Sequence, residues 1–306
     1  MPETLLEVRN LCVDFSTFRE TRRVLDDVTL AVHRGEMMGV VGETGSGKSI
    51  LQKAIIARLP KTARISEGQI LLDGRDLAKL SEDQLRAVRG KEISLLPAAG
   101  REALNPLAPV GLQIANAIRA HDNASKRDAE QRAVDLIRSV AIPDPEARAQ
   151  TYPHELSSGM AQRVLIAMAI ANSPALILAD EPTAGLDVTV QLQVLEIFAA
   201  LIRDHHSATL MVTRDLGIVA HFCQRVAVMR HGTIYEIAPV REFFSHAHHP
   251  YSRALLTAAR ASRGEIMMTD ETRRLLSGGR EAGSMETRRP ARLDMVGDSH
   301  FVRIAE

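Results

Sequence analysis

The sequence has no tryptophan, and aromatic residues make up only 3% of its 306 residues. Side chains on which bases could stack are therefore scarce. Lys and Arg together number 38, and so do Asp and Glu, so that the formal net charge is zero. Without a net positive field, the chain as a whole is not drawn to the phosphates of nucleic acid. We therefore expect no nucleic-acid partner.

Cysteine is also rare, with Cys12 and Cys223 far apart and outside any CxxC or CxxH pattern. This argues against a disulfide scaffold and a zinc site, and it predicts a reducing, cytosolic compartment. The first ten residues, MPETLLEVRN, lack the basic and then apolar pattern of a signal peptide. The sequence also lacks the run of about 18 apolar residues that a membrane span needs. We therefore expect a soluble protein that reaches a membrane only through a partner.

Short apolar runs alternate with stretches of helical periodicity, which predicts an α/β fold with a parallel sheet covered by helices. Strands are expected at 5–15, 28–32, 37–41, 175–179 and 208–212, a hairpin at 67–77, and helices at 48–58, 130–140 and 192–203. Residues 78–172 are expected to be mainly helical. After about residue 262 the chain is polar and rich in Arg, Gly and Ser, which predicts a linker or a mobile tail.

A glycine-rich loop follows the expected strand at 37–41. Its sequence, Gly42-Glu43-Thr44-Gly45-Ser46-Gly47-Lys48-Ser49, fits the pattern GxxxxGK[ST]. Glycines let the backbone wrap around phosphates, and the helix that follows adds the positive end of its dipole. We expect Lys48 to reach the β- and γ-phosphates and the Ser49 hydroxyl to bind Mg²⁺. The loop therefore predicts a site for ATP and Mg²⁺.

Two carboxylates, Asp180 and Glu181, end the apolar strand LILA. Asp180 suits a contact to Mg²⁺, either direct or through a water molecule. Glu181 suits polarising the attacking water as a general base. An acid pair at a strand end is weak support by itself, but after a phosphate loop it indicates ATP hydrolysis.

Between these motifs lies LSSGM at 156–160, and AGLD follows at 184–187. The order of phosphate loop, LSSGM, LILADEP and AGLD resembles the ABC-transporter ATPases. The resemblance implies a RecA-like P-loop core with an antiparallel β-layer and an inserted helical subdomain. It also implies that Ser157, Gly159 and Asp187 serve the ATP held by an opposite subunit. Ser158 replaces the first glycine that is usual in this signature.

Further motifs resemble one branch of that family, the dipeptide, oligopeptide and nickel importer ATPases. They are LNP (104–106), VGLQI (110–114), YPHELS (152–157), GLDVTVQ (185–191), DLGIVA (215–220) and HPYSRALL (249–256). The resemblance implies an importer ATPase for peptides, nickel or related small solutes, peripheral at the cytoplasmic face of the inner membrane. The implied partners are transmembrane permease subunits, a second ATPase subunit that is a paralogue and, indirectly, an extracytoplasmic solute-binding protein.

The same resemblance predicts four parts of the chain. They are 1–96 (first part of the ATPase core, with β-layer and phosphate loop), 97–165 (helical subdomain with the signature), 166–240 (second part of the core) and 241–306 (C-terminal extension and polar tail).

Two positions depart from the family pattern. Ala98 stands where the family has a glutamine that contacts Mg²⁺ and water. Arg214 stands where the family has a histidine that holds the γ-phosphate and the attacking water. Arginine still binds phosphate, but it offers no acceptor nitrogen. The two departures favour a catalytic site that binds ATP and turns it over slowly, in the weaker half of a heterodimer. Tolerated drift and a nucleotide-gated structural subunit without turnover remain the alternatives.

Two smaller groups of residues leave a choice open. His246, His248 and His249 could ligate a metal, although packing of the loop before Pro250 is the favoured interpretation. Phe15 and Phe18 are candidates for stacking on adenine, and a core role is favoured for Phe15.

Overall fold

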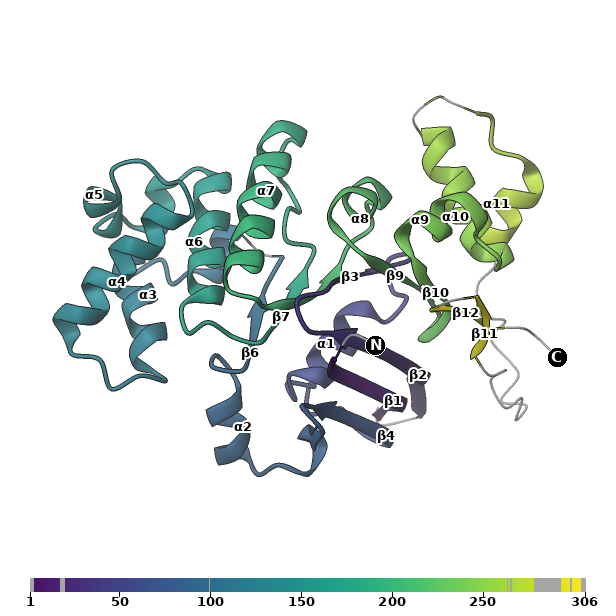
Figure 1. Cartoon of the computed structure of the whole chain (residues 1–306), viewed down its shortest axis with the longest axis horizontal. Coiled ribbons are helices and arrows are strands. Elements are labelled where there is room, and N and C mark those ends of the chain that lie inside the picture. The colour runs from purple at the N-terminus through teal and green to yellow at the C-terminus, as the bar shows by residue number, and fades with distance from the viewer. Residues whose placement is uncertain are drawn as a thin grey trace. The chain divides into compact units, whose positions relative to one another are not determined.

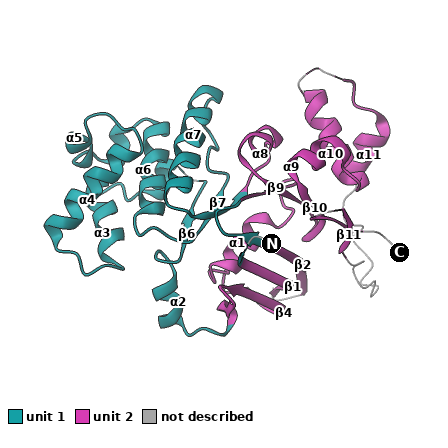
Figure 2. Cartoon of the chain, in the orientation of Figure 1, with its two compact units in different colours: residues 1–5, 32–36, 79–211 teal, residues 6–31, 37–78, 212–306 magenta. Residues whose placement is uncertain are grey.

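A computed structural model describes residues 3–16, 20–98, 100–262, 264, 266–277, 293–297 and 299–303. The chain divides into two compact units whose segments alternate along the sequence (Figure 2). Unit 1 comprises residues 1–5, 32–36 and 79–211, and unit 2 comprises residues 6–31, 37–78 and 212–306.

An antiparallel β-layer occupies the N-terminal part of unit 2. Its strands are β1 (Thr4–Ser16), β2 (Thr21–His33), β4 (Ala63–Leu72) and β5 (Arg75–Asp76), in the order β2-β1-β4-β5. β1 runs antiparallel to β4, with Leu6 opposite Leu72. The turn between β4 and β5 has positive φ at both Asp73 and Gly74, as a two-residue type I′ hairpin requires. The hairpin expected at 67–77 is therefore confirmed.

A second group of strands in unit 2 begins with β3 (Met37–Val41), whose five residues are all buried. This burial explains its uninterrupted apolar run. β3 pairs in parallel with β9 (Arg225–Arg230), and β10 (Thr233–Pro239) pairs antiparallel with β9. The same unit holds four helices that are labelled in Figure 1, namely α1 (Lys48–Ile55), α8 (Leu216–Phe222), α9 (Val240–His246) and α10 (Pro250–Ser262).

Unit 1 holds the parallel strands β6 (Ile93–Leu96) and β7 (Leu176–Asp180), and residues 208–211 of β8 (Ala208–Val212). Its helices are α2 (Glu82–Val88), α3 (Val110–Arg119), α4 (Lys126–Ser139), α5 (Pro145–Ala149), α6 (Ser158–Ile170) and α7 (Val188–Asp204). Four of these helices start at a residue whose side chain accepts a backbone N–H of the first turn, namely Ser81, Ser125, Ser157 and Asp187. The α/β fold with an antiparallel β-layer is confirmed.

The structure differs from the sequence-based expectations at several places. The stretch at 78–172 is mainly helical as expected, but it also holds strand β6, and α1 ends at Ile55 instead of continuing to residue 58. The C-terminal region is not only a linker or tail, because it forms α11 (Asp270–Ser277) and the hairpin of β11 (Leu293–Gly297) and β12 (His300–Arg303).

The C-terminal hairpin is ordered because its polar residues find partners within unit 2. Arg303 donates from Nε to the Ile234 carbonyl and from Nη2 to Asp27, and only 6% of its surface is exposed. β12 also adds to the sheet by pairing antiparallel with β10. Residues 278–292, part of the expected tail, lie outside the described residues.

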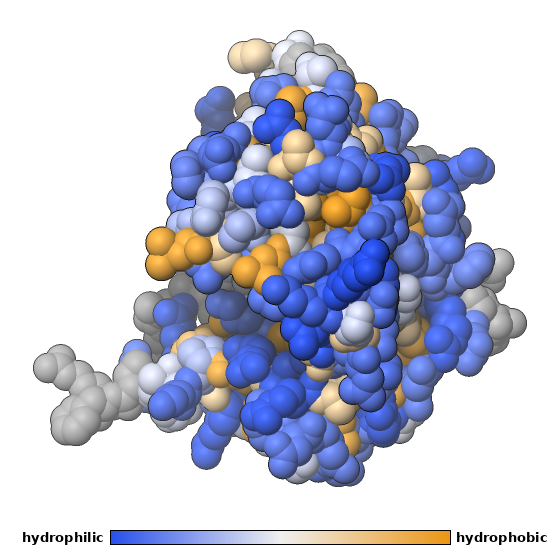
Figure 3. Space-filling model, turned by 90° about the vertical axis from the view of Figure 1, so that its left-hand side faces the viewer, coloured by the Kyte–Doolittle hydropathy of each residue, from blue (hydrophilic) through white to orange (hydrophobic). Residues whose placement is uncertain are grey.

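The face of the molecule in Figure 3 is largely hydrophilic, with apolar side chains in small separate groups. Within the described part of the chain, no helix is both long and apolar enough to cross a membrane.

Candidate functional site

The phosphate loop joins β3 to α1 in unit 2 and folds around its own lysine. Lys48 Nζ donates to the carbonyls of Gly42 and Glu43, each at 2.7 Å, and lies 3.1 Å from Ser46 Oγ. Only 6% of Lys48 is exposed. These contacts fix the ammonium group at the start of α1, where a lysine of this motif meets phosphate oxygens.

The cradle of the loop depends on glycine. A Cβ on Gly42 would lie 1.9 Å from the Met229 carbonyl oxygen, whereas a Cβ on Gly45 would meet nothing within 4 Å. The loop is therefore packed against β9 on one side and open on the other. Thr44 and Ser49 are both exposed. An open face with glycines, an anchored lysine and a hydroxyl at a helix N-terminus fits a nucleotide phosphate chain with Mg²⁺.

Arg214 lies beside this loop. It follows β8 and precedes α8, which begins where the Asp215 side chain accepts the Gly217 N–H at 2.7 Å. Arg214 Nη1 lies 3.5 Å from Thr44 Oγ1, at the long limit for a hydrogen bond. Arg214, one of the two residues that differ from the family pattern, therefore lies next to the exposed Thr44 of the phosphate loop.

The acid pair ends β7 in unit 1. Asp180 is the last residue of the strand, and both Asp180 and Glu181 are half-buried. Glu181 has a φ of +43°, in the left-handed region that non-glycine residues rarely adopt. Its carbonyl accepts the Ala184 N–H at 2.9 Å, which starts the turn toward Asp187. Backbone strain of this kind is concentrated at functional sites.

The signature opens α6, also in unit 1. The Ser157 side chain caps the helix by accepting the Met160 N–H at 3.2 Å, and Ser158 is exposed beside it. A Cβ on Gly159 would lie 2.6 Å from Val190 Cγ1, so glycine is required for α6 to pack against α7. Asp187 caps α7 by accepting the Val190 N–H at 3.0 Å. The fold thus brings Ser157, Gly159 and Asp187 to one place.

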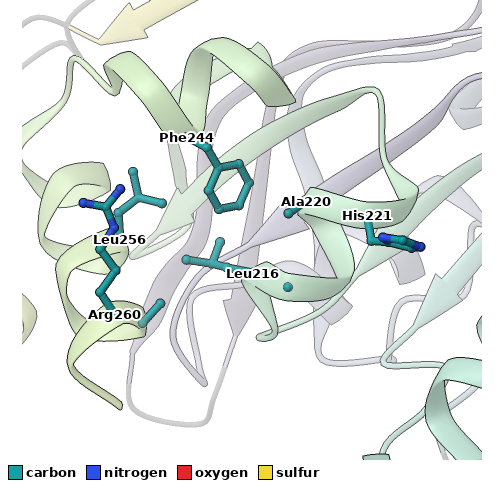
Figure 4. A pocket seen from close by; sticks show the side chains of 8 residues that line it. Leu216, Ala220, His221, Phe244, Leu256 and Arg260 are labelled. Carbon is teal, nitrogen blue, oxygen red and sulfur yellow. The ribbon is translucent and has the colours of Figure 1, made fainter. Parts of the chain in front are cut away.

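A cavity of about 350 Å³ lies in unit 2, between α8, α9 and α10. In Figure 4, Leu216, Phe244 and Leu256 turn toward one another, and the His221 ring points away from them. Arg260 of α10 also lines the cavity. The cavity therefore lies between α8, the helix that follows Arg214, and the helices α9 and α10 near the C-terminus, and it is lined largely by apolar side chains.

Comparison with known proteins identifies the family. A family model described as "ABC transporter" matches residues 25–184. The chain is 44% identical to the probable peptide ABC transporter ATP-binding protein y4tR of Sinorhizobium fredii, over 84% of this chain and 77% of that protein. It is 43% identical to the oligopeptide transport ATP-binding protein OppD of Bacillus subtilis, over 83% and 71% of the two chains. The chain belongs to the ABC transporter family.

The dipeptide transport ATP-binding protein DppD of Escherichia coli is 40% identical to this ABC protein, over 83% of this chain and 78% of that protein. Among solved structures, the dimeric ABC transporter cassette MJ0796 superposes with a TM-score of 0.69 at 25% identity, covering 78% of this chain and 99% of that one. The cbiO1 protein of Clostridium perfringens superposes with a TM-score of 0.67, covering 86% and 98%, and at 22% identity it supports the fold alone.

The candidate residues of this ABC protein fall into two sets. Residues 42–49 and Arg214 belong to unit 2, whereas Asp180, Glu181 and the signature group belong to unit 1. Ala98 follows β6 in unit 1 and is half-buried, with only a methyl group to offer. The roles of all these residues in binding and catalysis stay predictions.

The two open choices gain structural context. Among the described residues, no three or more His, Cys, Asp or Glu side chains form a group that could hold a metal ion. The three histidines before Pro250 therefore form no such group either. His248 and His249 instead donate their backbone N–H groups to Glu236. Phe15 is half-buried near the end of β1, and Phe18 lies outside the described residues.

Sequence reasoning missed a tyrosine whose side chain contacts the phosphate loop. Tyr251 of α10 donates its hydroxyl to Glu43 Oε1 at 3.2 Å. The motif HPYSRALL contains this tyrosine, but the motif gives no sign of a partner 208 positions earlier in the chain.

Proposed function

We propose that this chain is the ATP-binding subunit that powers an ABC importer, and that its cargo is peptides in preference to nickel or other small solutes. The observation that carries the proposal is the 40–44% identity to three peptide-transport ATP-binding proteins over more than four fifths of the chain. The complete phosphate loop with its anchored Lys48 supports the ATP-binding part. On this proposal the chain works at the cytoplasmic face of the inner membrane, on permease subunits that receive peptide from an extracytoplasmic binding protein.

Nucleotide binding is tested by Lys48→Ala, which removes the ammonium group from the open loop. MgATP affinity, measured by calorimetry, should fall at least about tenfold, or about 1.4 kcal/mol. Lys53→Ala is the matched control, because Lys53 is an exposed lysine of the same helix. Equal affinity of Lys48→Ala and wild type would refute the nucleotide site. Uptake of labelled peptide by vesicles with the assembled transporter then tests the cargo.

On this proposal the Ser49 hydroxyl and the Asp180 carboxylate would each be a ligand of Mg²⁺, because both offer the oxygen atoms that this ion prefers. The bound ion would neutralise charge on the β- and γ-phosphates. Glu181 would accept a proton from the attacking water, and Lys48 would donate hydrogen bonds to the phosphate oxygens.

We further propose that this chain is the weaker half of a heterodimer. The motivation is that Ala98 offers no polar group and Arg214 no acceptor, so that water positioning is lost while phosphate binding is kept. An intact paralogue would supply the faster site. Purification of the transporter after co-expression of all its subunits should give this chain and the paralogue in equal amounts. Two copies of this chain with no second ATPase would contradict the heterodimer.

Unequal work at the two sites is tested by two variants in the assembled transporter. Glu181→Gln removes a base from a site that already lacks its water-positioning residues, so most ATPase activity should remain, because effects within one catalytic unit are non-additive. Ser157→Arg blocks the site that relies on the partner's residues, so activity should fall by about 10²–10³. If Glu181→Gln is as inactive as Ser157→Arg, this chain's own site is fully catalytic.

The second candidate is a nucleotide-gated structural subunit without turnover of its own, which the same two departures favour. It predicts that the transporter with Glu181→Gln hydrolyses ATP at the full wild-type rate. This candidate would be excluded if Glu181→Gln lowers the ATPase rate and Glu181→Asp, which keeps a carboxylate, has a rate between that of Glu181→Gln and wild type.

A further inference from the structure

The C-terminal extension reaches the phosphate loop through one buried tyrosine. Tyr251 is 1% exposed and lies at the start of α10, where its backbone N–H donates to His249 Nδ1 at 3.1 Å. Its hydroxyl donates to Glu43 Oε1 at 3.2 Å. Glu43 is the second residue of the phosphate loop, so the tyrosine contacts the loop where it leaves β3.

The ring of Tyr251 is in contact with Arg230. The guanidinium carbon of Arg230 lies 4.5 Å from the ring centroid, in a cation–π arrangement. Arg230 also donates to the Leu276 carbonyl of α11 at 3.3 Å. Tyr251 of α10 is thus in contact with Arg230 of β9, which also contacts α11, and it presents its hydroxyl to Glu43.

The Tyr251 hydroxyl keeps its proton and therefore acts as a hydrogen-bond donor. Burial raises the pKa of Tyr251 above its ordinary value, and the charge of Glu43 adds to the effect. The phenol therefore remains protonated at neutral pH and donates to the Glu43 carboxylate. Hydrogen bonds to charged acceptors are stronger than those between neutral groups.

Glu43 connects this tether to the lysine of the loop. Its side chain accepts from Tyr251, and its carbonyl oxygen accepts from Lys48 Nζ at 2.7 Å. A shift of Glu43 therefore moves one of the carbonyl groups that anchor the ammonium group. At a second point of the loop, the Gly232 N–H donates to the Ser46 carbonyl at 2.8 Å. The loop is held at both of these points by segments from the second half of the chain.

We propose that Tyr251 is a positioning residue for nucleotide binding, which acts through Glu43 to hold the phosphate loop in the conformation that anchors Lys48. The C-terminal extension thereby preorganises the loop for ATP. This inference rests on the proposed nucleotide-binding function of residues 42–49. Without the tether a smaller fraction of molecules has a competent loop, and the apparent affinity falls in proportion to that fraction.

The test is MgATP binding by the full chain with Tyr251→Phe, which keeps the ring under Arg230 and removes only the hydroxyl. The dissociation constant should rise about threefold to tenfold, which corresponds to about 0.7–1.4 kcal/mol. In the assembled transporter KM for ATP should rise by a similar factor with kcat unchanged. Tyr235→Phe is the matched control, because its ring centroid lies 6.1 Å from that of Tyr251, and it should bind as wild type does.

A double-mutant cycle identifies the route. Tyr251→Phe should weaken binding no further in a Glu43→Ala background, and Glu43→Gln, which keeps an acceptor oxygen, should retain most of the affinity. Thermal unfolding without nucleotide verifies that each variant is folded.

Each outcome has one meaning. Two results would overturn the inference, provided that Lys48→Ala has lost MgATP binding. One is that Tyr251→Phe binds MgATP as tightly as wild type. The other is that Tyr251→Phe weakens binding as much in the Glu43→Ala background as it does in the wild-type chain. If Lys48→Ala also binds as wild type does, the proposed nucleotide site itself is wrong.

Discussion

The carboxylate of Glu236 makes three contacts in the core of unit 2 and offers a sharp test of how the C-terminal extension is held. Glu236 lies in β10 and is fully buried. Its Oε1 accepts the His248 N–H at 2.8 Å and lies 2.7 Å from His300 Nε2, and its Oε2 accepts the His249 N–H at 3.0 Å. One side chain thus ties the start of α10 and the C-terminal strand β12 to the sheet.

Glu236→Gln conserves the shape but replaces one acceptor oxygen by a donor group. In either amide orientation, at least one of the two backbone N–H groups then faces an NH₂ group. A buried donor without an acceptor costs about 1–3 kcal/mol. With about 2–4 °C per kcal/mol for a chain of this size class, the melting temperature should fall by about 2–12 °C. Glu236→Ala leaves both N–H groups without this acceptor and should cost more.

The measurement is thermal unfolding followed by circular dichroism. Glu242→Gln is the matched control, because Glu242 Oε2 lies 3.4 Å from His300 Nδ1 of the same histidine but its side chain is 45% exposed. Ion pairs of exposed groups contribute little, so this variant should melt close to wild type. If Glu236→Gln and Glu242→Gln melt at the same temperature, the buried carboxylate does not hold the extension as argued.

Three further outcomes are expected. Burial lowers the pKa of His249 in the folded protein. Below about pH 6.5 the unfolded chain therefore binds a proton more readily than the folded chain, so the free energy of unfolding measured in urea should fall as the pH is lowered. His249→Asn should make this pH dependence less steep, and an unchanged pH dependence would contradict the role given to His249. Burial also raises the pKa of the Cys12 thiol, so mass spectrometry should find Cys12 unalkylated by iodoacetamide at pH 8 until urea is added. Gly42→Ala, whose Cβ would lie 1.9 Å from the Met229 carbonyl, should abolish MgATP binding in calorimetry, whereas Gly45→Ala, with open space around its Cβ, should only weaken it.

Features encoded within a short stretch of sequence were predictable. The phosphate loop needs glycines, a lysine and a hydroxyl within eight positions, and all of them stand in residues 42–49. The hairpin at Asp73-Gly74 was also predictable, because two residues that tolerate positive φ separate two strand-like runs. The signature serine caps α6 through a contact three residues away, which local rules describe.

Features that depend on distant partners were not predictable in this way. The C-terminal hairpin is polar, and its order depends on the contact of Arg303 with Asp27, 276 positions apart. Strand β6 has only four residues, and its pairing with β7 spans more than 80 positions of the sequence. The Tyr251–Glu43 hydrogen bond spans 208 positions. Periodicity and composition describe only neighbouring positions of the sequence, so they do not predict contacts between residues this far apart. These contacts are seen only in the folded structure.

Ala98 and Arg214 are unequal departures, and their chemistry determines what the proposed heterodimer would retain. A methyl group makes no hydrogen bond, so whatever a polar side chain does at position 98 is lost outright. Arg214 lies at the open face of the loop, 3.5 Å from Thr44 Oγ1, and brings a permanent positive charge there. On the proposed function, Arg214 would keep affinity for phosphate but would offer water no acceptor. This chain would then still bind ATP, and it would still present Ser157, Gly159 and Asp187 to its partner. On the proposed function, slow turnover in this chain is then compatible with full participation in the transport cycle.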